Sequence, residues 1–153
     1  MDQIEFLISP NPGEPLRPLA KIASGGELSR VMLAIKTILA GTDQVETLIF
    51  DEVDTGVSGR AAQAIAEKLA RVAQKRQVLC ITHLPQVASM ADAHFLIKKE
   101  MSENETKTIV TKLSEEETVT ELARMLSGAE VTAKTEEHAR EMILLGRERK
   151  AVN

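Results

Sequence analysis

Two short apolar runs, separated by a helical pattern, constrain the fold of this chain more than any other feature. The first run, Thr47 to Phe50, ends in the acidic pair Asp51 and Glu52, and the second spans Val78 to Thr82. Between them, apolar residues recur at helical spacing from about Gly59 to Lys75. Short apolar runs of this kind are typical of strands buried in a parallel sheet. The order strand, helix, strand therefore predicts an α/β fold.

The rest of the chain adds helices and a hairpin to this core. We expect helices at Ser24 to Gly41, about Gly59 to Lys75, Pro85 to about Ala91, Ser114 to Gly128 and about Glu136 to Arg149. Two of them begin with a Ser-x-x-Glu capping box, which satisfies free backbone N–H groups of the first turn. The segments 95–99 and 108–113 flank a polar stretch and predict an antiparallel hairpin. The expected class is α/β, with a mixed, mainly parallel sheet flanked by helices.

The amino-terminal segment is expected to hold little regular structure. Ile4 to Ile8 predicts a short strand, after which prolines recur from Pro10 to Pro18. Proline fixes its own backbone and donates no hydrogen bond, so no regular structure is expected between that strand and about Leu19. This stretch is therefore predicted to be a loop.

Composition excludes several classes of protein. The chain has 153 residues, the length of one domain, with 43% hydrophobic and 27% charged residues. No apolar run is long enough to cross a bilayer, and the start lacks the pattern of a secretory signal, so a cytoplasmic protein is expected. The net charge of -4 disfavours a dedicated binder of the nucleic-acid backbone. A single cysteine, Cys80, excludes an internal disulfide.

The stretch Ser24 to Glu27 has two glycines at the start of a long helix. Glycines let backbone N–H groups approach an anion closely, and the helix dipole adds positive charge at that end. The stretch could therefore hold a phosphate. A capped helix preceded by a tight turn is an equally simple interpretation.

Acids and a histidine follow the two expected strands. Asp51 and Glu52 are suited to holding Mg²⁺ through water and to accepting a proton from an attacking water. Acids that cap the next helix are the alternative interpretation. His83 ends the second strand, at the edge where open α/β sheets bind ligands. His94 and His138 lack such a setting and are expected to be structural.

These three features follow one another in the order helix start, acidic strand end, histidine strand end. That order resembles the signature motif, Walker B motif and switch histidine of the ATP-binding-cassette ATPases, and in particular their SMC-like branch. The stretches that carry the resemblance are PNPGEPLRPLAKIASGGELSRVMLAIK, TLIFDEVDTGVSGRAA, ITHLPQVASMADAHFLI and LARMLSG. They are similar to the carboxyl-terminal part of a bacterial DNA repair ATPase of that branch. The resemblance covers nearly the whole chain.

The resemblance implies a role for each matching residue. The nucleotide-binding signature motif, which contacts ATP held by the opposite subunit, comprises Ser24, Gly25, Gly26 and Glu27. Asp51 is the residue associated with Mg²⁺, Glu52 is the general base, and His83 contacts the γ-phosphate. The D-loop between subunits spans 54–59 and contains Asp54, Ser58 and Gly59. Ser58 departs from the pattern, because many cassette ATPases have Asp there.

One element of a complete ATPase head is missing from the sequence. No Gly-Lys pair occurs, so there is no phosphate-binding loop of the form G-x-x-x-x-G-K-[ST]. In the family that loop belongs to the amino-terminal half of the head. We therefore expect residues 1–153 to be the carboxyl-terminal half of a head, inactive alone. ATP and Mg²⁺ would bind only in the complete head. The expected partners of this chain are the amino-terminal half of the same head, a second head, and DNA through the full-length protein. The expected role is recombinational repair of DNA double-strand breaks.

Two alternatives belong to other functional classes. The same half-head could serve as a non-catalytic dimerisation module. A phosphoacceptor signalling domain would instead use Asp51, Thr82 and Lys98. That domain needs a pair of acids at the end of its first strand, where this chain has Ile8 and Ser9.

Overall fold

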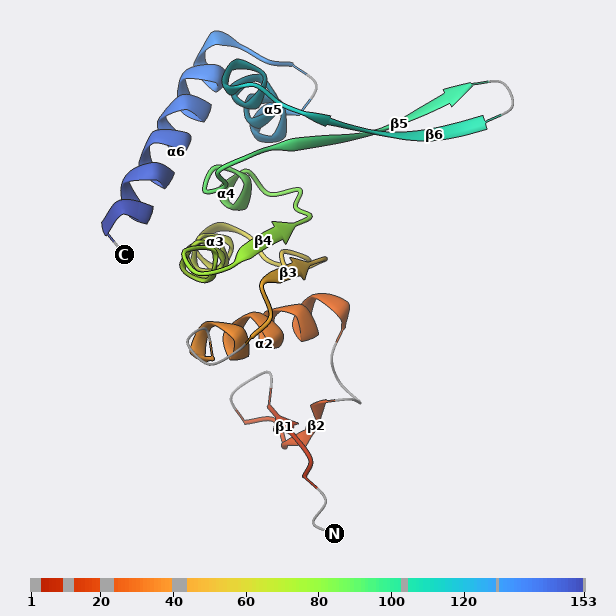
Figure 1. The fold of residues 1–153 in the computed structure, drawn as a ribbon, viewed down its shortest axis with the longest axis vertical. Coiled ribbons are helices and arrows are strands. Elements are labelled where there is room, and N and C mark those ends of the chain that lie inside the picture. Colours follow the sequence, from red (N-terminus) through yellow and green to blue (C-terminus); the bar gives the residue numbers. More distant parts are fainter. Residues whose placement is uncertain are drawn as a thin grey trace.

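The structure is a computed structural model that describes residues 4–9, 13–19, 24–39, 44–102, 105–128 and 130–152. Its strands are β1 (Leu7–Ile8), β2 (Arg17–Pro18), β3 (Thr47–Phe50), β4 (Gln77–Cys80), β5 (Phe95–Ser102) and β6 (Glu105–Lys112). Its helices are α2 (Gly25–Ile38), α3 (Gly59–Ala73), α4 (Pro85–Ala88), α5 (Glu115–Ser127) and α6 (Ala133–Val152). The molecule is elongated, with β1 and β2 towards one end and α5 and α6 at the other (Figure 1).

The main core lies between the parallel pair β3–β4 and helices α2, α3 and α4. Helix α3 buries one apolar face, consisting of Ala62, Ile65, Ala66, Leu69 and Val72. Against it pack the side chains from one face of the strand pair, which are Leu48, Phe50, Val78 and Cys80. These four residues pair across the strands as Leu48 with Val78 and Phe50 with Cys80. Alternation of side chains along a strand therefore gives this pair one covered face.

The other face of β3–β4 is uncovered by the described residues. Ile49, which pairs with Leu79, is 68% exposed, and Leu79 is 46% exposed. Ile81, just beyond β4, is 52% exposed. Burying apolar surface is the main favourable contribution to folding, at about 25 cal/mol per Å². An apolar sheet face left in water is therefore a surface suited to contact with another structural element.

In the part of the chain that the structure describes, the strands form three separate pairs. β1–β2 is antiparallel, β3–β4 is parallel and β5–β6 is antiparallel. The expected α/β class with both kinds of pairing is confirmed, and the expected mixed sheet is divided into these short sheets. The long hairpin β5–β6 forms no extension of the β3–β4 pair because it projects from the molecule as an arm (Figure 1). All residues of β6 are exposed.

Helices α5 and α6 form a second, smaller core. Its fully buried members are Val119, Leu122, Ala123 and Ala139. Exposed ion pairs join the two helices on the outside, Arg140 with Glu116 and Arg147 with Glu115. Because exposed pairs contribute only about 0.2 to 1 kcal/mol each, the apolar contact is the main source of this packing.

Most expected elements are confirmed with different ends, and β1 is shorter than the strand expected from Ile4 to Ile8. The prediction of a loop up to about Leu19 is wrong at Arg17–Pro18, which forms β2 and pairs with β1, because a short edge strand tolerates a proline. Both capping boxes form, at Ser24 and at Ser114, and Gly128 follows α5 with a φ of +78°. β4 ends at Cys80, two residues before the expected end; Ile81 N still donates to Phe50 O over 3.0 Å, after which the chain leads into α4. α6 is longer than expected at both ends. The predicted helix end at Gly41 and the turn residues Glu103 and Asn104 lie outside the described residues.

No helix in the described segments combines the length and the apolar character that crossing a bilayer requires.

Candidate functional site

The expected site residues converge where the amino end of α2 meets the carboxyl end of β3. Gly25 and Gly26 of α2 lie directly against Glu52, which follows β3. The side chain of Ser29, one turn into α2, donates a hydrogen bond to the backbone oxygen of Asp51 over 2.7 Å. Two motifs that are distant in sequence therefore form one local structure.

The amino end of α2 is a well-formed cap. Glu27 N donates to Ser24 Oγ over 3.3 Å, and Ser24 N donates to Glu27 Oε2 over 2.9 Å. Hydrogen bonds from the backbone and then the side chain of Ser24 lower the pKa of Glu27 below its usual value. Ser24 is exposed, so its side chain lies at the molecular surface beside the free N–H groups of the first turn.

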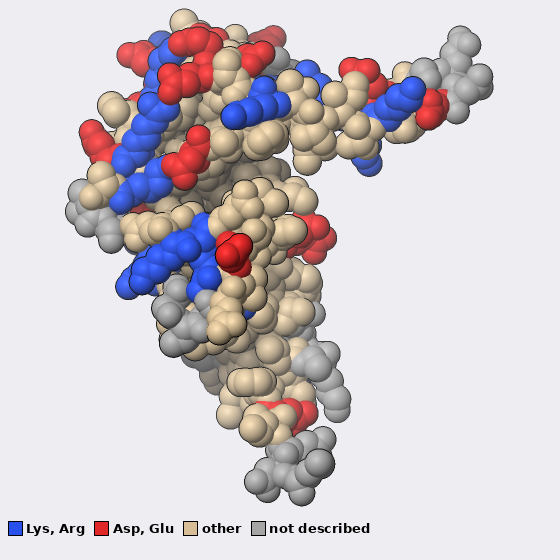
Figure 2. All heavy atoms as spheres, in the orientation of Figure 1, with Lys and Arg blue, Asp and Glu red and all other residues tan. Residues whose placement is uncertain are grey.

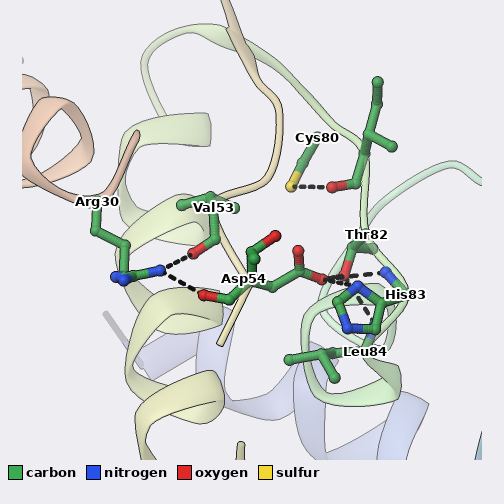
Figure 3. Close-up of polar contacts among 9 residues, drawn as sticks. Arg30, Val53, Asp54, Cys80, Thr82, His83 and Leu84 are labelled. Carbon is green, nitrogen blue, oxygen red and sulfur yellow. Dashed lines mark hydrogen bonds and ion pairs between the residues drawn. The ribbon is translucent and has the colours of Figure 1, made fainter. Parts of the chain in front are cut away.

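Gly26 allows α2 to approach the turn after β3. A Cβ at this position would lie 2.8 Å from the backbone oxygen of Glu52 and 3.1 Å from Thr55 Cβ. Arg30 reinforces the contact, because its guanidinium donates to the backbone oxygens of Thr55 at 2.8 Å and Val53 at 3.4 Å (Figure 3). The helix start and the turn at 51–55 are thus held together.

Glu52 has an unusual backbone conformation. Its φ is +57°, and it is the one non-glycine residue with positive φ in the described part of the chain. This region costs a residue with a side chain about 1 to 2 kcal/mol. Such strain often persists where it directs a functional side chain. The side chains of Glu52 and of Asp51 beside it are both exposed.

Asp54, the first residue of the expected D-loop, is buried. Only 2% of it is exposed. Its Oδ2 accepts hydrogen bonds from Thr82 Oγ1 at 2.5 Å and from His83 N at 3.0 Å. His83 Nδ1 lies 3.3 Å from the same oxygen, while the His83 side chain remains 69% exposed (Figure 3).

The remainder of the expected D-loop leads into α3. Ser58 occupies the N-cap position of α3, but its side chain makes no capping hydrogen bond. Gly59 follows with a φ of +52°, a conformation that glycine adopts without strain. Both residues are exposed. The end of the loop that carries Ser58 and Gly59 is therefore accessible to solvent, whereas Asp54 at its start is buried.

Cys80 lies beside the site, but its thiol is unreactive near neutral pH. Burial first, and then the negative charges of Asp54 and Asp51, raise the pKa of its thiol to about 12. A thiol with so high a pKa is almost entirely protonated near neutral pH, and the thiolate is the reactive form. The geometry gives Cys80 no role as a nucleophile.

The phosphoacceptor arrangement is not assembled by this fold. The hydroxyl of Thr82 is hydrogen-bonded to Asp54, and Lys98 belongs to the projecting β5 strand, where it pairs with Ile109. His138 lies in α6, where its Nδ1 is 3.5 Å from Oε2 of Glu141, one turn further along the same helix. Within the described residues, no group of three or more His, Cys, Asp or Glu side chains is arranged to hold a metal ion.

Two residues contribute to the site without having been predicted. Ser29 and Arg30 bind backbone oxygens of the turn 51–55. Two adjacent polar residues shortly after the signature stretch were a weak signal. Nothing in the sequence indicates their partners, which lie more than 20 positions away.

Comparison with known proteins gives a consistent result. The DNA repair protein RecN of Bacillus subtilis (strain 168) is 59% identical over 143 residues, which is 94% of this chain and 25% of that protein. RecN of Treponema pallidum (strain Nichols) is 54% identical over 145 residues, 95% of this chain and 25% of that protein. The chain therefore spans about a quarter of the length of the curated relatives it matches. No family model matches it.

One solved structure also aligns with the chain. It is described as "Structural biochemistry of ATP-driven dimerization and DNA stimulated activation of SMC ATPases", and the alignment covers 81% of each chain at 18% identity with a TM-score of 0.49. A likeness of this size carries no further argument.

The structure packs a capped, glycine-rich helix start against paired acids that follow a parallel strand. Over 94% of its length the chain matches DNA repair proteins of one family. It belongs with the RecN proteins, of which it corresponds to about a quarter.

Proposed function

We propose that this chain is the carboxyl-terminal half of a RecN-like ATPase head, and that ATP is bound and hydrolysed between two such heads once the amino-terminal half is present. The observation that carries the proposal is the direct contact between the glycines of α2 and the strained Glu52. It unites a helix start suited to phosphate with an acid suited to proton transfer.

The exposed residues have distinct chemical tasks in this proposal. The N–H groups at the start of α2 and the Ser24 hydroxyl face the γ-phosphate of ATP held by the opposite head. Glu52 accepts a proton from the attacking water of its own head, and His83 contacts the γ-phosphate there. Ser58 and Gly59 lie on the accessible side of the D-loop, where a second head would approach.

The donor set fits Mg²⁺ held mainly by nucleotide and water. Mg²⁺ prefers oxygen ligands and usually keeps several waters, with only one or two protein carboxylates. Asp51 supplies one exposed carboxylate at the end of β3. When bound, the ion would neutralise negative charge on the phosphates.

The uncovered face of β3–β4 supports the amino-terminal half as a partner. Ile49, Leu79 and Ile81 expose apolar surface on this face. On the side of the molecule seen in Figure 2, charged side chains gather towards the α5–α6 end, a further group of Lys and Arg lies on the left at mid-height, and the lower surface carries few charges. An uncharged, apolar sheet face is typical of a surface that is buried within a domain.

The cellular role is assigned by similarity to the RecN proteins. We assign recombinational repair of DNA double-strand breaks, a homodimer of heads, and a cytoplasmic, nucleoid-associated location. DNA would be engaged through the full-length protein. The non-catalytic dimerisation module remains the second candidate, and an activity measurement separates the two.

Complementation tests the proposal directly. The chain and the missing amino-terminal half are purified separately, and ATP turnover is measured for each and for the mixture. We expect neither part to hydrolyse ATP and the mixture to do so. A mixture that forms a stable complex but has no turnover would favour the dimerisation module. The matched control is the same mixture with Glu52→Gln, which should assemble without turnover.

A further inference from the structure

The Asp54 carboxylate is the most completely buried charged group of the site. Only 2% of it is exposed, although it belongs to the turn after β3 that carries the exposed Glu52 and contacts the loop after β4 that carries the exposed His83. Burying a carboxylate is costly unless hydrogen bonds compensate for the lost water. Here one oxygen, Oδ2, receives all the side-chain contacts recorded for this residue, from Thr82 and His83.

These contacts determine the shape of the loop that carries His83. Thr82 Oγ1 donates to Asp54 and accepts a hydrogen bond from Leu84 N at 3.0 Å. His83 N donates to Asp54 at 3.0 Å. The backbone on both sides of His83 is thus held through one buried carboxylate, which belongs to the same turn as Glu52.

The contact with the His83 ring fixes which nitrogen faces outward. Nδ1 lies 3.3 Å from Asp54 Oδ2, while 69% of the side chain is exposed. A carboxylate in contact with one ring nitrogen orients the ring and thereby sets the direction of the other nitrogen. The Nε2 edge of His83 is therefore the edge that can meet a ligand at the surface.

We infer that Asp54 is a positioning residue that acts through His83, holding the His83 ring and loop in the orientation needed for the γ-phosphate and tying that loop to the turn of Glu52. The inference rests on the proposed function. It differs from the role implied by the D-loop resemblance, in which Asp54 would itself lie between subunits.

Steady-state ATP turnover of the complete protein tests this inference. The variants are Asp54→Asn, His83→Ala, the double variant and Thr82→Val, with Asp92→Asn as a matched control. Asp92 is an exposed aspartate outside the site, paired with Lys150. Misplacing a reacting or contacting group by about 1 Å can cost roughly 10²-fold in rate. We therefore expect Asp54→Asn to lower kcat by roughly 10- to 100-fold and to change KM for ATP by less than about threefold. Asp92→Asn should match the wild type.

The double variant separates positioning from an independent role. If Asp54 acts through His83, adding Asp54→Asn to His83→Ala should slow turnover no further than His83→Ala alone. Multiplicative losses would overturn the inference. So would wild-type kcat in Asp54→Asn.

Thr82→Val keeps the test decisive if Asp54→Asn does not fold. It removes the hydrogen bond from Thr82 to the carboxylate and the one from Leu84 N to Thr82, with little change of shape. Its loss of kcat should also vanish in the His83→Ala background. A Thr82→Val enzyme with unchanged kcat would then count against the inference. If His83→Ala has normal ATP turnover, the proposed role of His83 is wrong. If His83→Ala has slow turnover and Asp54→Asn has wild-type turnover, only the positioning role of Asp54 is rejected.

Discussion

The carboxylate of Glu52 lies against Gly25, in the space that a side chain at Gly25 would occupy: a Cβ there would overlap Glu52 Oε2. At the next residue, Gly26, a Cβ would lie 2.8 Å from the backbone oxygen of Glu52. The first obstacle is the end of a flexible side chain, and the second is backbone. The two glycines therefore constrain different properties of the site.

Alanine substitutions at these glycines should have separable effects. Gly26→Ala should lower the free energy of unfolding by about 1 to 3 kcal/mol, because a rigid backbone atom must move. Gly25→Ala should change it by less than about 0.5 kcal/mol, since only the Glu52 side chain must rotate. Turnover of the complete protein should nevertheless fall in Gly25→Ala. Urea denaturation and ATPase assays measure the two effects, and equal destabilisation by both changes would contradict the account.

Glu52→Gln tests the proposed general base. Loss of the carboxylate should reduce turnover by roughly 10² to 10⁴-fold, while ATP binding survives. Because the site would stay loaded, ATP-dependent dimers of heads should accumulate, which light scattering can measure. The amide keeps the shape of the side chain, so the free energy of unfolding should change little. Unchanged turnover would show that another residue activates the water.

Ser24 tests whether the site is shared between subunits. If Ser24 only caps α2, Ser24→Ala should cost about 1 kcal/mol of stability and Ser24→Arg should not specifically block dimerisation. If it faces ATP on the opposite head, Ser24→Arg in the full-length protein should bind ATP but neither dimerise nor hydrolyse. Mixing it with a variant lacking the Walker lysine of the amino-terminal half should restore one working site. Heterodimers without ATPase activity would mean either that Ser24 acts in its own subunit or that both ATP sites must act together. Measuring the ATP occupancy of the single intact site distinguishes these two explanations.

Much of this arrangement could be predicted from the sequence because it rests on local patterns. The caps at Ser24 and Ser114 depend on residues three positions apart, and the strand at Thr47–Phe50 depends on its own apolar run. The burial of Asp54 could not be predicted in this way. Its partners, Thr82 and His83, lie 28 and 29 residues away and approach it only through the pairing of β3 with β4.

His94 should make stability sensitive to mild acid. Its Nε2 is buried without a hydrogen-bond partner among the described residues, and burial, followed by the positive charge of Lys150, lowers its pKa below 6.5. The unfolded chain therefore binds a proton more readily than the folded chain. This contribution to stability is complete above about pH 6.5 and is lost as the pH falls through the folded pKa.

Thermal unfolding between about pH 7.5 and pH 5.5 measures this effect. The wild type should lose melting temperature on acidification, and His94→Gln should lose less. Glu27 and Glu117 have pKa values lowered from 4.5 by their capping hydrogen bonds, so their contribution disappears only at more acidic pH. Equal pH dependence of the two proteins would exclude His94 as the cause.

Calorimetric titration of this chain with Mg-ATP, alone and then joined to the amino-terminal half, tests the central claim most directly. Alone, the chain lacks the phosphate-binding loop and its lysine, and it should give no measurable binding while circular dichroism shows it folded. Joined to the missing half, it should bind ATP, and turnover should depend on Glu52. Micromolar binding of Mg-ATP to the chain alone would contradict the assignment of this chain as half of a shared ATP site.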